Sequence, residues 1–309
     1  MKRQKDCVGL ICSDIDFVEY FVFLLTSIKH YTLKAIWCSD LERSIQLAAD
    51  NDIPSVSHTA YQLISRTDIN TVIITGYPSH NALFYAQAQA LQKCVICIGA
   101  VSLSIECAQL LNEIAQKYNA SINVIYPLKY STPLALIRSN LAKIGEIQNI
   151  NLESTFKAKI LERNRLYYDS NVMLQKLGHE FIDAVYSLCV EMPQKIAVAH
   201  RDTSSIVDHF RLRELESAHL QIAFGNIVAS FHITVSNVDS INIRIRGTRG
   251  LMQLNEHILT IETQESQSVL WRGDGVFENV IKEGIMNALN SKAFMAGPSE
   301  ICLVHCCSS

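Results

Sequence analysis

Short hydrophobic runs alternate with longer amphipathic segments over the first 126 residues. The runs have the length and the β-branched content of buried strands, whereas the segments between them have the length and periodicity of helices. Such an alternation predicts a doubly wound α/β domain built on a parallel sheet. The expected strands are 8–11, 33–38, 71–74, 94–98 and 122–126, the expected helices are 17–28, 41–51, 60–65, 81–91 and 104–118, and an extended piece is expected at 53–56.

The pattern changes from residue 147 onward. Polar and apolar residues now alternate, which is typical of an antiparallel sheet with one covered face. The chain is therefore predicted to form an α/β domain at residues 1–125 and an α+β domain with a mostly antiparallel, open-faced sheet at residues 126–309. The expected strands are 147–156, 195–199, 220–224, 227–234, 241–246 and 258–262, the expected helices are 174–190 and 277–289, and the charged stretch 201–216 is expected to be a solvated excursion between strands.

Composition and charge exclude several classes of protein. The 309 residues are 49% hydrophobic and 18% charged, which is enough apolar material for two cores. The net charge is -3, and Lys and Arg are scattered singly, so no nucleic-acid partner is expected. The apolar run 17–28 is too short to cross a bilayer, and no secretory signal is recognised. The expectation is a cytoplasmic protein without a membrane partner.

Ten cysteines raise the question of disulfides or metal. Most lie within predicted strands and helices, where a reduced thiol behaves as a small hydrophobe. Cys94 and Cys97 form a C-x-x-C motif, but side chains three positions apart on a strand point to opposite faces. Near the C-terminus, the residue types of Cys302, His305, Cys306 and Cys307 suit a metal, but adjacent cysteines chelate poorly together and no second cluster completes a site of four ligands. No metal site is predicted.

The turn after the first predicted strand lacks the glycines of a phosphate loop. A dinucleotide-binding βαβ unit carries G-x-G-x-x-G there, and the three glycine slots here hold Cys12, Asp14 and Phe17. Carboxylates of Asp14 and Asp16 also stand where a helix N-terminus would receive phosphate. Asp16 followed by Glu19 predicts a capping box, in which the helix satisfies its own N-terminus.

A second cue for a dinucleotide is missing at the end of the strand 33–38. An acidic residue normally follows the second strand and binds the ribose hydroxyls. Here the strand ends at Cys38, and Asp40 comes too late and is predicted to cap the next helix. The two absences together predict no binding, or weak binding, of NAD(P).

Several short motifs nevertheless keep a familiar spacing. Together they resemble the Gfo/Idh/MocA oxidoreductases, the glucose-fructose oxidoreductase-like family, over nearly the whole chain. The matching segments are 68–74 (D-I-D-A-V-x-I in the family), Pro78 to His80 (P-x-H), Tyr126 with Lys129 and Tyr130 (Y-x-x-R-F), 143–147 (L-G-E-I) and 245–250 (G-T-x-G).

The resemblance implies a Rossmann-like domain followed by an α+β domain, and a nicotinamide-dependent dehydrogenase of sugars, sugar nucleotides or polyols. It also implies a dimer or tetramer formed through the open sheet. The family's functional residues are not kept here. Gly99 stands where the family has a substrate-orienting lysine, and Lys176 and Glu180 match the Asp and the His of its D-x-G-x-H motif. His179 is one residue out of register with that histidine, about 100° around a helix.

The family's ligand positions can still be located on this chain. The altered cofactor positions are Cys12, Ser13, Asp14, Cys38, Pro78 and His80, and the walls of a substrate cleft would carry Tyr126, Lys129 and Tyr130. That mixture of aromatic rings and polar tips suits a small polar ligand.

The leading hypothesis is a non-catalytic binding or partner subunit, because chemical motifs are lost while framework motifs are kept. It is expected to form a homo-oligomer, or a hetero-oligomer with a related active chain, through an exposed sheet face carrying the apolar positions of 227–245.

The competing hypothesis is an atypical NAD(P)-dependent oxidoreductase. His179 would be its base, because an unperturbed Glu180 is too weak and Lys176 too fully protonated at neutral pH. A third interpretation makes His179 a helix-start residue that donates to a backbone carbonyl.

Overall fold

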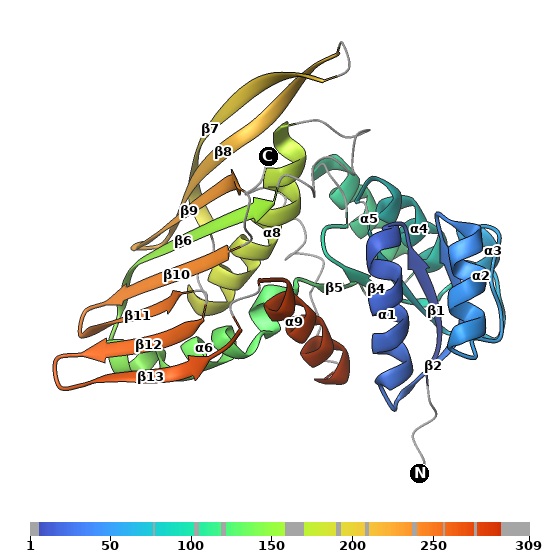
Figure 1. Cartoon of the computed structure of the whole chain (residues 1–309), viewed down its shortest axis with the longest axis horizontal. Helices are drawn as coiled ribbons and strands as arrows, with labels where there is room; N and C mark the ends of the chain where they lie inside the picture. The colour runs from blue at the N-terminus through green and yellow to red at the C-terminus, as the bar shows by residue number, and fades with distance from the viewer. Residues whose placement is uncertain are drawn as a thin grey trace. The chain divides into compact units, whose positions relative to one another are not determined.

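The computed structural model describes residues 6–76, 78–101, 105–118, 122–157, 170–189, 193–207, 210–236, 240–255, 257–274 and 277–291. The chain divides into two compact units (Figure 1). The first unit reaches Ile125 and also includes residues 288–291 of the closing helix, and the second unit runs from Tyr126 to Asn287. Among the described residues, no helix is long and apolar enough to cross a membrane.

The first unit is built on a five-stranded sheet in the order β2-β1-β3-β4-β5, in which every pair is parallel. Its interior strand β1 (Asp6–Cys12), which lies between β2 and β3, is buried from Val8 onward, because helices cover the sheet and leave no wet face. Val56 adds a parallel bridge to Ile36 at the β2 edge. The other elements are β2 (Tyr31–Cys38), β3 (Thr71–Thr75), β4 (Cys94–Ile98), β5 (Ile122–Ile125), α1 (Ile15–Ser27), α2 (Leu41–Asp50), α3 (Ala60–Ile64), α4 (Pro78–Ala90) and α5 (Ile105–Tyr118).

The second unit contains an eight-stranded sheet in the order β13-β12-β11-β10-β6-β9-β8-β7. All pairs are antiparallel except β6 with β9. The predicted class, a Rossmann-like α/β domain plus an α+β domain with a mostly antiparallel sheet, is therefore confirmed. The elements are η1 (Pro127–Tyr130), α6 (Thr132–Ile144), β6 (Ile147–Lys157), α8 (Ser170–Cys189), β7 (Pro193–Val207), β8 (Phe210–Phe224), β9 (Ile227–Ser236), β10 (Ser240–Gly247), β11 (Gly250–Asn255), β12 (Ile258–Thr263), β13 (Gln267–Arg272) and α9 (Phe277–Ser291).

Helices lie against one face of this second sheet (Figure 1). Helix α8 contacts β6, β8 and β9, and α6 contacts β11, β12 and β13. The alternation along each strand follows from this layering: Phe231 and Ile243 are buried, whereas their neighbours His232 and Arg244 are exposed.

Three parts of the second unit differ from the sequence prediction. Helix α6 and strands β11 and β13 were not predicted, and the stretch 201–216, expected as an excursion, lies largely in β7 and β8. These two strands pair with each other in a long antiparallel hairpin (Figure 1). A two-stranded ribbon forms through backbone pairing and tolerates charged side chains, so hydrophobic alternation does not reveal it.

Two motifs that carry the family resemblance meet at the end of α6. Arg249 donates its backbone N–H to Ile144 O at 2.8 Å, and Thr248 Oγ1 accepts the N–H of Glu146 at 3.2 Å. Gly145 has a φ of +80°, and a Cβ on Gly247 would lie 2.2 Å from Ile144 O. Glycine is therefore required for the close approach that caps this helix.

Candidate functional site

The carboxyl ends of β1, β2 and β3 form the place where a doubly wound sheet binds dinucleotides; we call it the crest. Cys12 and Cys38 end β1 and β2 and are partners in the parallel register. Both are buried, and each thiol donates to its own loop: Cys12 to Asp14 O at 3.1 Å, and Cys38 to Asp40 O at 2.8 Å. Burial raises the pKa of the Cys12 thiol well above its usual range, so it stays neutral.

Ser13 closes the space between the loops that follow β1 and β3. Its N–H donates to Thr75 O at 3.0 Å, and its carbonyl accepts from the Ser39 hydroxyl at 3.4 Å. Gly76 has a φ of +114°, and a Cβ there would lie 2.1 Å from Ser13 Oγ and 2.9 Å from Asp14 N. Protein atoms therefore fill the position between these loops.

Helix α1 also differs from a phosphate-binding helix. It begins at Ile15, so Asp16 lies inside the first turn, and the side chain of Asp16, on which the predicted capping box with Glu19 depends, lies outside the described residues. Glu19 instead binds Arg43 of α2 at 2.6 Å. In the first turn, Ile15 and Phe17 are 41% and 40% exposed, and such apolar side chains offer nothing to a phosphate.

The end of β2 supplies no ribose acid. The prediction that Asp40 caps the next helix is confirmed, because its carboxylate accepts the Arg43 N–H at 3.0 Å at the start of α2. The half-buried Trp37 packs edge-on against Phe84 of α4, with ring centroids 5.4 Å apart. The described residues of the crest therefore do not fit a dinucleotide.

The loop before α4 contains a buried amide that the sequence analysis missed. Asn81 is fully buried and donates from Nδ2 to Gly76 O at 3.4 Å and to Ala100 O at 3.3 Å. It thereby ties the loops after β3 and β4 together. In the sequence, Asn81 could have been noticed only as a polar residue in the first turn of the helix that follows β3. The side chains of Pro78 and His80, two predicted cofactor positions, lie outside the described residues.

The predicted cleft and base residues come together in the second unit. Tyr126, just before η1, stacks on His179 of α8 with centroids 6.0 Å apart and an interplanar angle of 17°. Both side chains are buried. The interpretation of His179 as a helix-start residue is wrong, because α8 begins at Ser170. The side chain of Lys176 lies outside the described residues.

Two carboxyl groups of α8 hold η1. Glu180 Oε2 accepts the N–H of Leu128 at 3.1 Å, and Asp183 Oδ1 accepts from Lys129 Nζ at 3.0 Å. Lys129 Nζ also lies 5.2 Å from the centre of the Tyr130 ring. We call Lys129, Glu180 and Asp183 the α8–η1 cluster. Asp183 was not predicted, because nothing in the sequence shows that it meets Lys129.

Glu180 is not the unperturbed acid that the sequence analysis assumed. Burial raises its pKa to about 8, aided by the charge of Asp183, while the Leu128 N–H and Lys129 oppose the shift. A carboxyl group that exchanges its proton near neutral pH is unusual, and such groups concentrate at functional sites. The expectation that an unperturbed Glu180 is too weak a base therefore does not apply, and His179 as the base stays a prediction.

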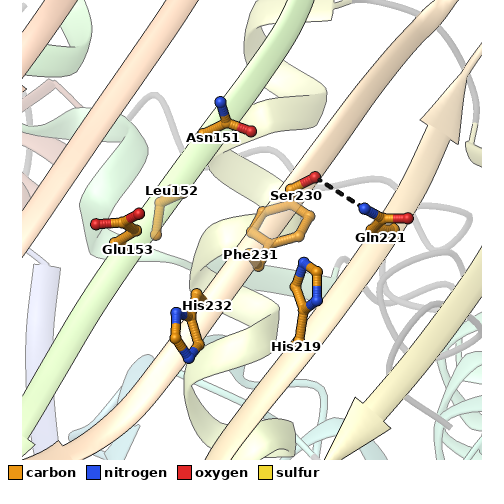
Figure 2. A pocket seen from close by; sticks show the side chains of 8 residues that line it. All are labelled: Asn151, Leu152, Glu153, His219, Gln221, Ser230, Phe231 and His232. Atoms are coloured by element: carbon orange, nitrogen blue, oxygen red, sulfur yellow. Dashed lines mark hydrogen bonds between the residues drawn. The ribbon is translucent and has the colours of Figure 1, made fainter.

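A shallow depression of about 330 Å³ lies on the sheet of the second unit, on the side opposite α6 and α8 (Figure 2). We call this side the outward face. Glu153, His232 and His219 lie in one row across β6, β9 and β8, because each is the register partner of the next. The depression is lined by Asn151, Leu152, Glu153, His219, Gln221, Ser230, Phe231 and His232.

The outward face is polar, whereas the apolar positions of 227–245 were expected to be exposed on it. The apolar residues Ala229, Phe231, Ile233, Ile241, Ile243 and Ile245 of that segment are buried, whereas Val228 is 45% exposed. The alternation of polar and apolar residues along these strands was recognised from the sequence. The helices, however, cover the side of the sheet that carries the apolar residues.

A scan of the sequence against protein-family models gives no match, and neither does a search of curated proteins. Solved structures match over the whole chain. An oxidoreductase from Agrobacterium radiobacter in complex with NAD+, L-tartaric acid and magnesium has a TM-score of 0.82 at 13% identity, covering 99% of this chain and 94% of that one.

Two further structures are similar to a comparable degree. A putative myo-inositol dehydrogenase from Sinorhizobium meliloti 1021 and a UDP-N-acetylglucosamine 3-dehydrogenase from Acidithiobacillus ferrooxidans each have a TM-score of 0.77 at 14% identity, covering 98% of this chain and 95% of theirs. These neighbours are dehydrogenases of the Gfo/Idh/MocA type. At this identity the likeness concerns the fold alone, and the chain has the two-domain fold of the Gfo/Idh/MocA oxidoreductases.

Proposed function

We propose that this chain is a non-catalytic binding or partner subunit that keeps a Gfo/Idh/MocA fold. The contact between Ser13 and Gly76 at the crest carries the proposal. A pyrophosphate needs backbone N–H groups that point into open space at a helix N-terminus. Here the Ser13 N–H is bonded to Thr75 O, and Asp14 adds a carboxylate beside that space.

Calorimetric titration of the full chain with NAD+, NADH, NADP+ and NADPH tests this proposal. We expect no binding, or binding much weaker than micromolar, because the ligand would have to break the Ser13 contacts and approach Asp14. A dehydrogenase of the same fold, measured under the same conditions, is the positive control. A dissociation constant in the low micromolar range, about -8 kcal/mol, would contradict the proposal.

The partner surface in this proposal is the outward face of the second sheet, and the partner is a second copy or a related active chain. Exposed groups of opposite charge on this face, Arg244 and Glu153, suit an isologous contact in which each meets its counterpart across a two-fold axis. The polar character of this face favours a transient interface, in which the subunits associate and dissociate, rather than an obligate one.

Light scattering, with and without a related chain, tests the surface. Val228→Arg places a charge on the outward face and should lower the assembled fraction. Leu83→Arg, at a position 59% exposed on α4 of the first unit, is the matched control and should leave assembly intact. Equal effects of the two substitutions would rule out the outward face, and a strictly monomeric chain under all conditions would rule out assembly.

An atypical oxidoreductase is the second candidate function, and one observation favours it. Glu180 has a pKa of about 8, in the range that suits a general acid or base at neutral pH. A screen of sugars, sugar nucleotides and polyols with NAD(P) tests this candidate. His179→Ala should lower any turnover found by about two to four orders of magnitude if His179 is the base. An inactive wild type across the panel supports the non-catalytic proposal.

A further inference from the structure

The outward face of the second sheet carries two histidines side by side (Figure 2). His219 of β8 and His232 of β9 are register partners in an antiparallel pair, so their Cβ atoms lie about 4.5–5.5 Å apart. Both side chains are exposed, whereas the residues on either side of them along each strand are buried. Two imidazoles therefore extend from neighbouring strands on the same side of the sheet.

The spacing of the two rings suits a shared metal ion. Their centroids lie 6.2 Å apart, and the ring planes are tilted by 58°. Imidazole nitrogen binds zinc at about 2.0–2.1 Å, so two imidazoles on one tetrahedral ion have ring centres about 5 Å apart. A small rotation of two exposed side chains closes the difference. His232 Nε2 lies 3.3 Å from the Thr234 hydroxyl, and losing this exposed hydrogen bond costs little because water replaces it.

The charges around the pair favour a cation. Glu153 of β6 is the register partner of His232, so a carboxylate stands beside the pair in the same row. In the described part of the chain, the residues that line the depression include no lysine or arginine. Arg244 is the register partner of Asn151 on β10, two strands from His232. Two strand spacings are roughly 10 Å, a distance over which salt screens the charge of an exposed group.

The rows of side chains that flank the histidine row on these three strands are neutral. One row consists of Asn151, Ser230 and Gln221, and the other of Thr155, Thr234 and Ser217. Their amides and hydroxyls can hydrogen-bond to water bound by an ion, and they add no positive charge to repel it. The depression therefore combines two metal-ligating rings with surroundings that tolerate a divalent ion.

We propose that His219 and His232 form a two-histidine site for a divalent transition-metal ion such as Zn²⁺. Imidazole suits zinc, nickel and copper, whereas magnesium and calcium prefer oxygen ligands. Among the described residues, no group of three or more ligating side chains is found, so the chain supplies two ligands and leaves the other coordination positions to water. Glu153 is a positioning residue, which accepts a hydrogen bond from the His232 nitrogen that does not bind the ion.

Titration of the full chain with Zn²⁺, followed by NMR of the histidine rings, tests the site. Each ring gives its own signals, so zinc bound by cysteines elsewhere in the chain does not enter this measurement. We expect the signals of His219 and His232 to move together and to saturate below about 1 mM zinc. Signals that stay in place at this concentration, or that move with two different dissociation constants, would overturn the proposal.

Substitutions distinguish a shared ion from two independent histidines. His219→Ala and His232→Ala should each weaken zinc binding at the remaining ring by at least about tenfold, because the second ligand is lost. Glu153→Gln should weaken binding about tenfold while both rings still move together. His58→Ala, which removes an exposed histidine of the first unit, is the matched control and should change neither ring. A remaining ring that keeps the wild-type affinity in either single variant would show independent binding and contradict the proposal.

The site can be tested apart from the proposed assembly, although both lie on the outward face. Val228→Arg should lower the assembled fraction, but it leaves both histidines in place and should keep zinc binding. A chain that binds zinc at this pair and stays monomeric supports the site and contradicts the proposed partner surface. A chain that assembles through this face without zinc binding at the pair contradicts the site and leaves the proposed function standing.

Discussion

The crest of the first unit and the α8–η1 cluster of the second both contain predicted ligand-binding residues, but their chemistry differs. At the crest, short thiol and hydroxyl groups are bonded to nearby carbonyls. The cluster has kept buried charge, with Lys129 paired to Asp183 and Glu180 beside them. Under the proposed function the first region does not receive an anion, whereas titratable groups of the second region hold η1.

The two regions differ in how their polar groups are satisfied. At the crest, the close approach of Ser13 and Gly76 fills the space between the loops. In the cluster, each polar side chain finds a partner in η1, so the charge persists as part of the fold. Substitutions that disrupt one region or the other should therefore differ in their effects.

The largest expected effect comes from breaking the buried ion pair. Lys129→Ala removes the cation beside Asp183, whose side chain is 4% exposed, and should lower the free energy of unfolding by about 3–5 kcal/mol. Glu19→Ala breaks the pair with Arg43 in the first unit, where the side chains are 68% and 40% exposed, and should change it by at most about 1 kcal/mol. Urea denaturation measures both, and equal effects would show that the cluster is not specially buried.

The pH dependence of stability gives the second effect. The folded pKa of Glu180, about 8, lies above its ordinary value of 4.5, so the folded protein binds a proton that the unfolded chain has released. The contribution of Glu180 to stability is therefore complete below about pH 4.5 and is lost as the pH rises to about 8, by a few kcal/mol in total. Urea denaturation at a series of pH values measures this fall. Glu180→Gln should flatten this part of the profile, and an unchanged slope in that variant would assign the fall to another group.

Gly76 offers the corresponding test at the crest. Gly76→Ala combines a φ of +114° with a Cβ 2.1 Å from Ser13 Oγ, and should cost about 2–3 kcal/mol of stability. Gly99→Ala is the matched control, because Gly99 has a φ of +86° but no atom within 4 Å of the added Cβ. It should cost about 1 kcal/mol, from backbone strain alone. Similar losses by thermal denaturation would mean that the Ser13 contact is not tight.

Local pattern predicted much of the fold. The strand Cys94–Ile98 was predicted with its observed bounds, since a strand buried in a parallel sheet is a short apolar run between turns. Asp40 was recognised as a cap because a cap depends on residues within one turn. Helix α6 was missed because only a narrow stripe of it, including Leu134 and Ile137, is buried.

The chemistry of the candidate site depends on contacts that no local pattern contains. Glu180 meets Leu128 across 52 positions of the chain, and Asp183 meets Lys129 across 54. The sequence alone placed Glu180 near the site but gave no reason to expect a raised pKa, because that shift comes from burial against η1.

The smallest expected effect concerns Asp40, which follows the strand where a ribose acid would stand. Asp40→Ala should lower stability by about 1 kcal/mol, because the Arg43 N–H loses its acceptor at the start of α2. Asp40→Asn should be nearly neutral, since an asparagine side chain caps a helix about as well. Thermal denaturation and nucleotide titration of both variants check this role. If Asp40→Asn is stable but loses a measurable affinity for NAD(P), Asp40 binds a ribose, and the crest receives a nucleotide by a route that the Ser13–Gly76 contact does not block.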